Sequence, residues 1–133
     1  MTSSVQPRKQ RNARRDATMQ ERKKLMHSRI APALRQKLGT RMRSILVRKG
    51  DKVKVTSGSY KKKEGTVLEA SYSALKLFIE GVTRKNSRGQ EKLVKVDPSN
   101  VQIIDGDFSL KNRKAILERS AKAAPGPVPE HKK

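Results

Sequence analysis

The chain has 133 residues, enough for one ordinary domain or for a smaller domain with tails. It carries 33 Lys and Arg against 12 Asp and Glu, and a formal net charge of +21 opposes compaction unless a polyanion neutralises it. Because cysteine is absent and the apolar stretches are short, the composition excludes disulfides, thiolate metal sites and a membrane span, and we expect an intracellular, soluble protein.

The positive charge is concentrated at the N-terminal end. Residues 1–50 carry 15 Lys and Arg against Asp16 and Glu21, a net charge of +13, whereas residues 51–104 carry +5 and residues 105–133 carry +3. A basic arm beside a more balanced block is the usual layout of a nucleic-acid binder. A solvated surface is an equal alternative for a short lysine cluster, but it does not account for the whole first third of the chain.

Residues 1–27 form a basic N-terminal extension with few large apolar side chains. Such a segment cannot bury enough surface to offset the entropy of ordering, so we expect it to be disordered until it binds. Residues 28–44 follow as a short helix and a linker. Pro32 near the first turn, good helix formers after it and Gly39 behind them predict a helix over residues 31–39.

Residues 45–104 have the two-residue period of half-buried strands. Val53 and Val55, for example, alternate with polar residues, and turn residues separate the segments. We therefore predict a mainly β protein whose centre is a small closed or partly open barrel. The five expected strands are 52–56, 65–70, 75–80, 93–96 and 101–104, with 45–48 as a possible sixth, leading strand.

A C-terminal helix is predicted within residues 105–124. Ser109 is its expected N-cap, and Pro125 is expected to end it. The Pro-rich residues 125–133 should then form a stiff, extended tail.

No group of residues has a catalytic or metal-binding pattern. His27 and His131 have no Cys, acid or second His at metal-ligand spacing. No serine lies in a nucleophile elbow, and no phosphate-binding loop is recognisable. We therefore expect a protein that is not an enzyme and has no cofactor, no metal and no small-molecule substrate.

Four aromatic residues are too few for a surface that binds single strands mainly by stacking. We expect Phe78 to fill the barrel and Phe108 to pack the C-terminal segment. Tyr60 precedes a run of lysines and has two equal alternatives, packing on its own barrel or contact with RNA. Recognition should therefore depend on phosphates, sugars and RNA shape.

Residues 50–67 resemble a KOW motif. The segment has the Gly-Asp start, alternating valines, a glycine turn at Gly58, a basic loop and a second glycine, Gly65, before a valine. Gly58 permits a tight turn, and Gly65 begins the returning strand without a side chain in the way. Lys62 stands about where many members have a glycine. The resemblance implies a barrel of the SH3-like kind.

The surrounding sequence resembles one family of large-subunit ribosomal proteins, numbered twenty-six in eukaryotes and twenty-four in bacteria. Residues 34–37 and 41–51 are similar to its eukaryotic and archaeal form, with Leu46 where this form often has proline. Residues 96–101 resemble the family's strand and turn, and residues 111–119 resemble the C-terminal helix of its eukaryotic version. The likeness covers residues 30–122, and the first 25 match in basic character only.

This resemblance implies a structural constituent of the large ribosomal subunit that binds ribosomal RNA through basic arms and the KOW loop. It implies a place near the exit of the nascent-peptide tunnel and a role in subunit assembly, and thereby in translation. The implied partners are large-subunit ribosomal RNA and neighbouring large-subunit proteins. The implied location is the cytoplasmic ribosome, with the nucleolus or nucleus during assembly.

Two other functions fit the sequence less well. A KOW module of a transcription elongation factor would need a further domain or more KOW copies, and it leaves the basic arm unexplained. A cationic membrane-surface protein would need an amphipathic helix with a large apolar face, and no segment supplies one.

The residues expected to contact RNA lie in the arm, the first helix and its linker, two loops of the barrel and the C-terminal helix. They are Arg8, Lys9, Arg11, Arg14, Arg15, Arg22, Lys23, Lys24, Arg29, Arg35, Arg41, Arg43, Arg48, Ser57, Gly58, Tyr60, Lys61, Lys62, Lys63, Arg84, Lys85, Arg88, Lys111, Arg113 and Lys114.

Overall fold

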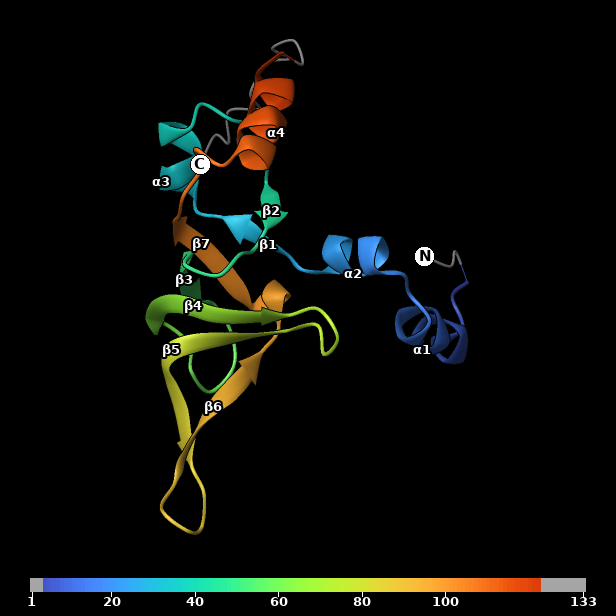
Figure 1. The fold of residues 1–133 in the computed structure, drawn as a ribbon, viewed down its shortest axis with the longest axis vertical. Coiled ribbons are helices and arrows are strands. Elements are labelled where there is room, and N and C mark those ends of the chain that lie inside the picture. The colour runs from blue at the N-terminus through green and yellow to red at the C-terminus, as the bar shows by residue number, and fades with distance from the viewer. Residues whose placement is uncertain (1–3, 123–133) are drawn as a thin grey trace, which may run out of the picture.

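The computed structural model describes residues 4–122, and its strands form one curled sheet (Figure 1). The sheet has seven strands in the order β2-β1-β7-β3-β4-β5-β6, which confirms the predicted small, mainly β barrel. β1 and β7 are parallel, and the other neighbours are antiparallel. The elements are α1 (Pro7–Arg15), α2 (Met19–Leu25), β1 (His27–Ile30), α3 (Pro32–Lys37), β2 (Ser44–Leu46), β3 (Lys52–Val55), β4 (Glu64–Ser71), β5 (Lys76–Lys85), β6 (Glu91–Val96), the 3-10 helix η1 (Pro98–Asn100), β7 (Val101–Asp105) and α4 (Lys111–Lys122).

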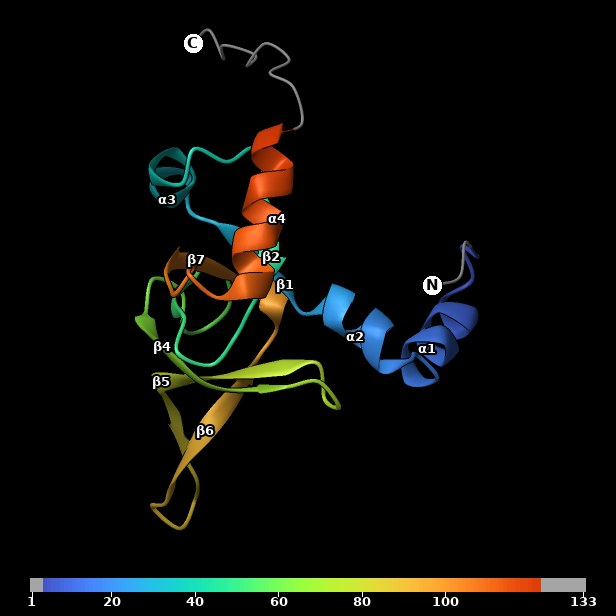
Figure 2. The ribbon, with the colours of Figure 1, turned by 45° about the horizontal axis from the view of Figure 1, so that its top comes forward.

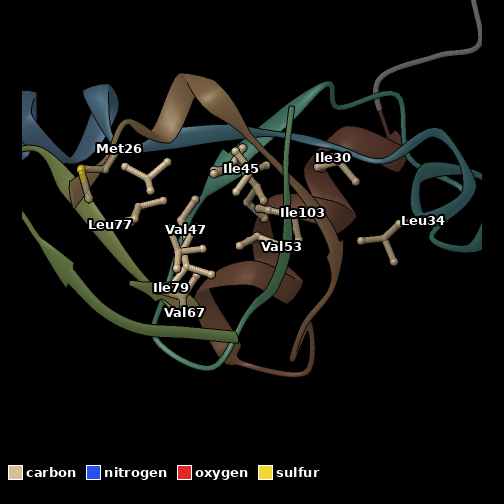
Figure 3. Close-up of a cluster of buried hydrophobic side chains, with 14 residues drawn as sticks. Met26, Ile30, Leu34, Ile45, Val47, Val53, Val67, Leu77, Ile79 and Ile103 are labelled. Carbon is tan, nitrogen blue, oxygen red and sulfur yellow. The ribbon is translucent and has the colours of Figure 1, made fainter. Parts of the chain in front are cut away.

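The core is aliphatic and comes mainly from alternate positions of the strands (Figure 3). In β3 and β7 every second residue is buried, because successive side chains of a strand point to opposite faces. The buried apolar residues are Met26, Ile30, Leu34, Ile45, Val47, Val53, Val55, Val67, Leu77, Ile79, Val82, Val96, Val101 and Ile103.

Phe78 does not fill the barrel, and that prediction was wrong. Its neighbours Leu77 and Ile79 are fully buried, so the strand period places Phe78 on the opposite face, where it is only half-buried. Phe108, in contrast, packs against the core from the C-terminal segment as expected.

Strand β1 was not among the five or six predicted strands. Its buried positions are Ser28 and Ile30, and a polar residue at a buried position hides the alternation. Ser28 is 1 % exposed, and its hydroxyl donates to the carbonyl oxygen of Pro98 at 2.5 Å. The hydrogen bond satisfies the hydroxyl and makes its burial possible.

The N-terminal arm is helical here and not an extended chain. Helices α1 and α2 contain no buried residue, so local interactions hold them. Thr18 and Glu21 form a capping box at the start of α2, and Arg22 donates to the carbonyl oxygens of Arg15 and Ala17 at 3.0 Å each. Both ribbon views show the arm standing away from the barrel (Figures 1 and 2). Disorder of the free arm in solution stays a prediction.

A buried ion pair joins α4 to the barrel. Asp51 and Arg113 are each 2 % exposed, and the Arg113 guanidinium donates to both carboxylate oxygens of Asp51, at 2.7 Å to Oδ1. The same guanidinium donates to the carbonyl oxygens of Leu46 at 2.9 Å and Asp107 at 3.0 Å. Asp51 Oδ2 also accepts a hydrogen bond from the backbone N–H of Arg48 at 2.8 Å. The motif's Gly-Asp start therefore holds the C-terminal helix.

Helix α4 begins at Lys111, two residues after the predicted cap. The carbonyl of Leu110 accepts the first helical bond, from the backbone N–H of Lys114 at 2.9 Å. Ser109 instead donates to Asp107 Oδ1 from both its hydroxyl and its backbone N–H, and these bonds lower the pKa of Asp107. The predicted stop at Pro125 and the tail 125–133 lie outside the described residues.

A substitution at Gly65 tests the close approach of β4 to β5. A Cβ at this position would overlap the carbonyl oxygen of Glu80, which is backbone and cannot rotate away. We expect Gly65→Ala to lower the free energy of unfolding by about 1–3 kcal/mol, measured by urea denaturation. The neighbouring change Glu64→Ala removes only an exposed ion pair with Lys54 and should cost less than about 1 kcal/mol. Equal stabilities of the two variants would contradict the packing argument.

Substitutions at Arg113 test how much the buried ion pair with Asp51 stabilises the fold. We expect Arg113→Ala to lower the free energy of unfolding by about 3–5 kcal/mol, because it leaves the Asp51 carboxylate buried without its partner. Arg113→Lys should restore little of this loss, because an ammonium group cannot make the paired bonds of a guanidinium. The exposed neighbour Lys114→Ala is the control and should leave thermal unfolding within a few degrees of wild type. An Arg113→Ala variant as stable as Lys114→Ala would refute the role of the pair.

Candidate nucleic-acid interface

The basic loop, residues 57–63, is held in one conformation by hydrogen bonds to β3. The backbone N–H of Lys62 donates to the carbonyl of Val55 at 2.9 Å, and the N–H of Val55 donates to the carbonyl of Lys63 at 2.8 Å. Gly58 has φ +92°, as its turn requires. Lys62 has φ +72°, a left-handed conformation that suits glycine, the residue that the resemblance to KOW motifs leads one to expect at about this place. The three lysine side chains are exposed.

Tyr60 packs on its own barrel, the first of its two alternatives. Its ring is half-buried against the core, and its hydroxyl donates to the carbonyl of Thr83 at 3.2 Å. The Lys63 ammonium lies 5.4 Å from the centre of the ring. These contacts attach the basic loop to β5. RNA contact by the accessible part of Tyr60 stays a prediction.

A second basic surface lies on the hairpin of β5 and β6, the basic hairpin (residues 84–92). β5 bends where the pairing with β6 is irregular, and Gly81 in this stretch has φ +75°. Beyond the bend the hairpin extends away from the barrel (Figure 1). Its tip surrounds a shallow, mostly polar hollow whose cations are Arg84, Lys85, Arg88 and Lys92. Lys92 was not predicted, although it follows the loop directly.

The cations of the arm fall into two groups. Arg15 forms an exposed ion pair with Asp16 at 2.9 Å, which lowers the pKa of Asp16, and Arg22 is bound to backbone carbonyls. The others are exposed and have no ion pair with a described residue: Arg8, Lys9, Arg11, Arg14, Lys23 and Lys24. These unpaired cations are the part of the arm whose charge a polyanion can neutralise.

The cations on α3 and the β1–β2 side differ in exposure. Arg29, Arg41 and Arg43 are exposed, whereas Arg35 and Arg48 are partly buried. The Nε of Arg35 is buried without a hydrogen-bond partner among the described residues. A small hollow near Arg29 is lined by His27, Ser44, Thr56, Ser99, Val101 and Gln102, and burial lowers the pKa of His27.

Arg113 cannot contact RNA in this structure, and its place among the predicted RNA ligands is corrected. It is buried, and its guanidinium is occupied by Asp51 and two carbonyl oxygens. The sequence around Arg113 is basic and does not indicate that its partner is Asp51, which lies 62 positions away. Lys111 and Lys114 on the same helix are exposed.

Other kinds of site find no support in the described part of the chain. Across residues 4–122 no three His, Cys, Asp or Glu side chains gather where they could hold a metal ion. Within the same residues no helix combines the length and the apolar character needed to cross a membrane.

Comparisons with known proteins show which chains this one is similar to. The family model described as the eukaryotic ribosomal proteins L26 and their archaeal counterparts, numbered L24, matches residues 4–120. A curated protein named large ribosomal subunit protein uL24, from Pyrobaculum islandicum, is 38 % identical over 121 residues. The alignment covers 91 % of this chain and 97 % of that protein. The family-model match includes the basic arm as well as the barrel.

The positive φ of Lys62 gives a prediction that separates strain from charge. Lys62→Gly and Lys62→Ala remove the same charge, but only glycine adopts φ +72° without steric cost. We expect the glycine variant to be more stable than the alanine variant by about 1 kcal/mol, measured by chemical denaturation at moderate salt. Equal stabilities would mean that the loop relaxes away from this conformation.

Proposed function

This chain belongs to the family of the eukaryotic ribosomal proteins L26 and their archaeal counterparts, and we propose that it binds large-subunit ribosomal RNA through its exposed cations. It is a structural protein of the large ribosomal subunit, and its family is not one of enzymes. The proposed contacts are the basic loop, the basic hairpin, the arm, the cations around β1, α3 and β2, which are Arg29, Arg35, Arg41, Arg43 and Arg48, and Lys111 and Lys114 of α4.

The observation that carries this proposal is the joined pair of basic surfaces at one end of the barrel. The Tyr60–Thr83 hydrogen bond fixes the basic loop beside β5, which continues into the basic hairpin. Lys61, Lys62 and Lys63 form no ion pair with any described residue, because Glu64 pairs with Lys54 and Glu91 lies by Lys85. Adjacent uncompensated cations repel one another unless a polyanion lies against them.

The arm is the part of the chain best suited to a role in assembly. Its helices bury no residue, and most of their cations have no ion pair with a described residue, so these cations can lie along RNA and displace counterions. They are Arg8, Lys9, Arg11, Arg14, Lys23 and Lys24. We propose that it helps to fold RNA around the barrel near the exit of the nascent-peptide tunnel, beside neighbouring large-subunit proteins. The work would be done in cytoplasmic ribosomes and, during assembly, in the nucleolus or nucleus.

The elongation-factor alternative is less well supported. It leaves the basic arm without a role, whereas the ribosomal family model matches the arm together with the barrel over residues 4–120. No observation on the described residues favours it.

Charge reversal in the basic loop tests the proposal. Replacing Lys61, Lys62 and Lys63 by Glu should reduce incorporation into large subunits in cells and weaken binding to purified large-subunit ribosomal RNA. Each lost phosphate contact should also lower the slope of log K against log salt by about 0.7–0.9. Thermal unfolding should change little, because the three side chains are exposed.

The matched control reverses three exposed lysines that are not assigned to RNA, Lys37, Lys49 and Lys52. It makes the same change in net charge, so a general loss of attraction would weaken both triple variants equally. A loop variant that assembles as well as wild type and keeps its salt slope would refute contact between this loop and RNA.

A further inference from the structure

A groove lies between α4, β2 and the turn that joins β4 to β5. Its volume is about 470 Å³, within the range of roughly 300–1,000 Å³ in which small-molecule sites fall. α4 lies in front of β2 in the second ribbon view (Figure 2). The lining side chains combine an apolar floor with a cationic rim, and none of them is acidic: Lys23, Leu46, Arg48, Tyr72, Asn112, Ala115, Ile116 and Arg119.

Helix α4 presents two different stripes to the rest of the protein. Arg113 and Ser120, seven residues apart, face inward, where Arg113 pairs with Asp51 and the Ser120 hydroxyl lies 3.0 Å from that of Thr40. The neighbouring stripe has the spacing i, i+3, i+4, i+7 and lines the groove. It consists of Asn112, Ala115, Ile116 and Arg119. The contacts of Arg113 and Ser120 therefore hold α4 in place, and the other stripe of α4 forms one wall of the groove.

Arg48 is positioned in the groove by the same buried pair. Its backbone N–H donates to Asp51 Oδ2 at 2.8 Å, and its carbonyl oxygen accepts from the N–H of Asp51 at 3.3 Å. Its guanidinium has no ion pair or hydrogen bond with a described residue. On α4 the Nε of Arg119 donates to the carbonyl of Ala115 at 3.2 Å, which leaves its two terminal nitrogens available. Two guanidinium groups thus border one groove.

Tyr72 gives the groove an aromatic surface. Its ring packs partly against the core, so its position is fixed. Its hydroxyl and the side-chain amide of Asn112 have no hydrogen-bond partner among the described residues. The groove therefore offers a ring for stacking, polar groups for a base edge, and guanidinium groups suited to paired bonds with phosphate.

We propose that this groove binds a single unstacked nucleotide of RNA, with its base on Tyr72 and its phosphates on Arg48 and Arg119. The inference rests on the proposed RNA-binding function and adds a site that reads a bulged or looped-out base. A protein segment is a poorer occupant. An apolar peptide would leave the guanidinium groups desolvated and unpaired, and no lining carboxylate is present to balance them.

The test uses the full chain and two RNA hairpins that are identical except for one unpaired adenosine in the stem. A bulged base costs little to unstack, so the wild-type chain should bind the bulged hairpin more tightly than the fully paired one. Tyr72→Ala should reduce this preference by at least about fivefold, the lower end of base–aromatic stacking, and Tyr72→Phe should keep it. Because Tyr72 packs on the core, thermal unfolding of each variant is measured alongside.

A second pair of variants avoids the core. Arg119→Gln, exposed at the rim, should weaken binding of the bulged hairpin more than that of the paired one. Lys114→Gln, exposed on α4 outside the groove, should weaken both equally. The chain has two tyrosines and no tryptophan, so the part of the fluorescence change that Tyr72→Phe removes comes from Tyr72. This part should fall when the bulged hairpin binds and stay unchanged with the paired one.

The outcomes separate the two proposals. Wild-type binding of both hairpins with equal affinity, unaffected by Tyr72→Ala and Arg119→Gln, would overturn the nucleotide site and leave the proposed function intact. Failure of the wild type to bind either hairpin at low salt would overturn the proposed function itself. If the groove variants keep the RNA preference and instead lose binding to an isolated large-subunit protein, the occupant is protein and the inference is wrong.

Discussion

The buried pair of Asp51 and Arg113 is the contact on which the arrangement of this protein depends. Two charges removed from water require good geometry, and here the guanidinium satisfies both carboxylate oxygens and two carbonyl groups at once. Gly106 lies so close that a Cβ there would fall 2.6 Å from Asp51 Oδ1, so backbone also closes over the pair. The pair links the first turn of the KOW segment to α4, and through α4 it sets the wall of the groove and the position of Arg48.

Burial divides the charges of the chain into structural and functional ones. With a net charge of +21, most cations must stay in water or meet an external anion. Arg113 is buried instead, and its burial is possible because Asp51 is buried with it. The basic loop and the exposed cations of the arm have no such partner in the described chain. A small aliphatic core holds the barrel and the remaining charge is exposed, so the proposed binding of RNA would also stabilise the folded protein.

The sequence predicted the barrel because strand alternation is a local signal. Val53 and Val55 revealed β3, and the KOW spacing placed Gly58 and Gly65 correctly. It missed β1, where Ser28 occupies a buried position, because the Pro98 carbonyl that satisfies its hydroxyl is distant in sequence. It assigned Arg113 to RNA for the same reason, since the acid that buries it lies 62 residues away. The error at Phe78 is local, because the alternation that buries Leu77 and Ile79 already places Phe78 on the other face. The errors at β1 and Arg113 depend on partners that only the fold brings together.

The same distinction explains why the groove was not predicted. Its residues come from α2, β2 and the segment that follows it, the β4–β5 turn and α4, and no single segment of the sequence signals a shared site. A helical spacing of Asn112, Ala115, Ile116 and Arg119 is visible in the sequence, yet by itself it describes an ordinary amphipathic helix. It becomes a candidate site because the Asp51–Arg113 pair sets the rotation of α4, so that this stripe faces Arg48 and Tyr72. The buried ion pair therefore also brings Arg48 and Arg119 to the same groove.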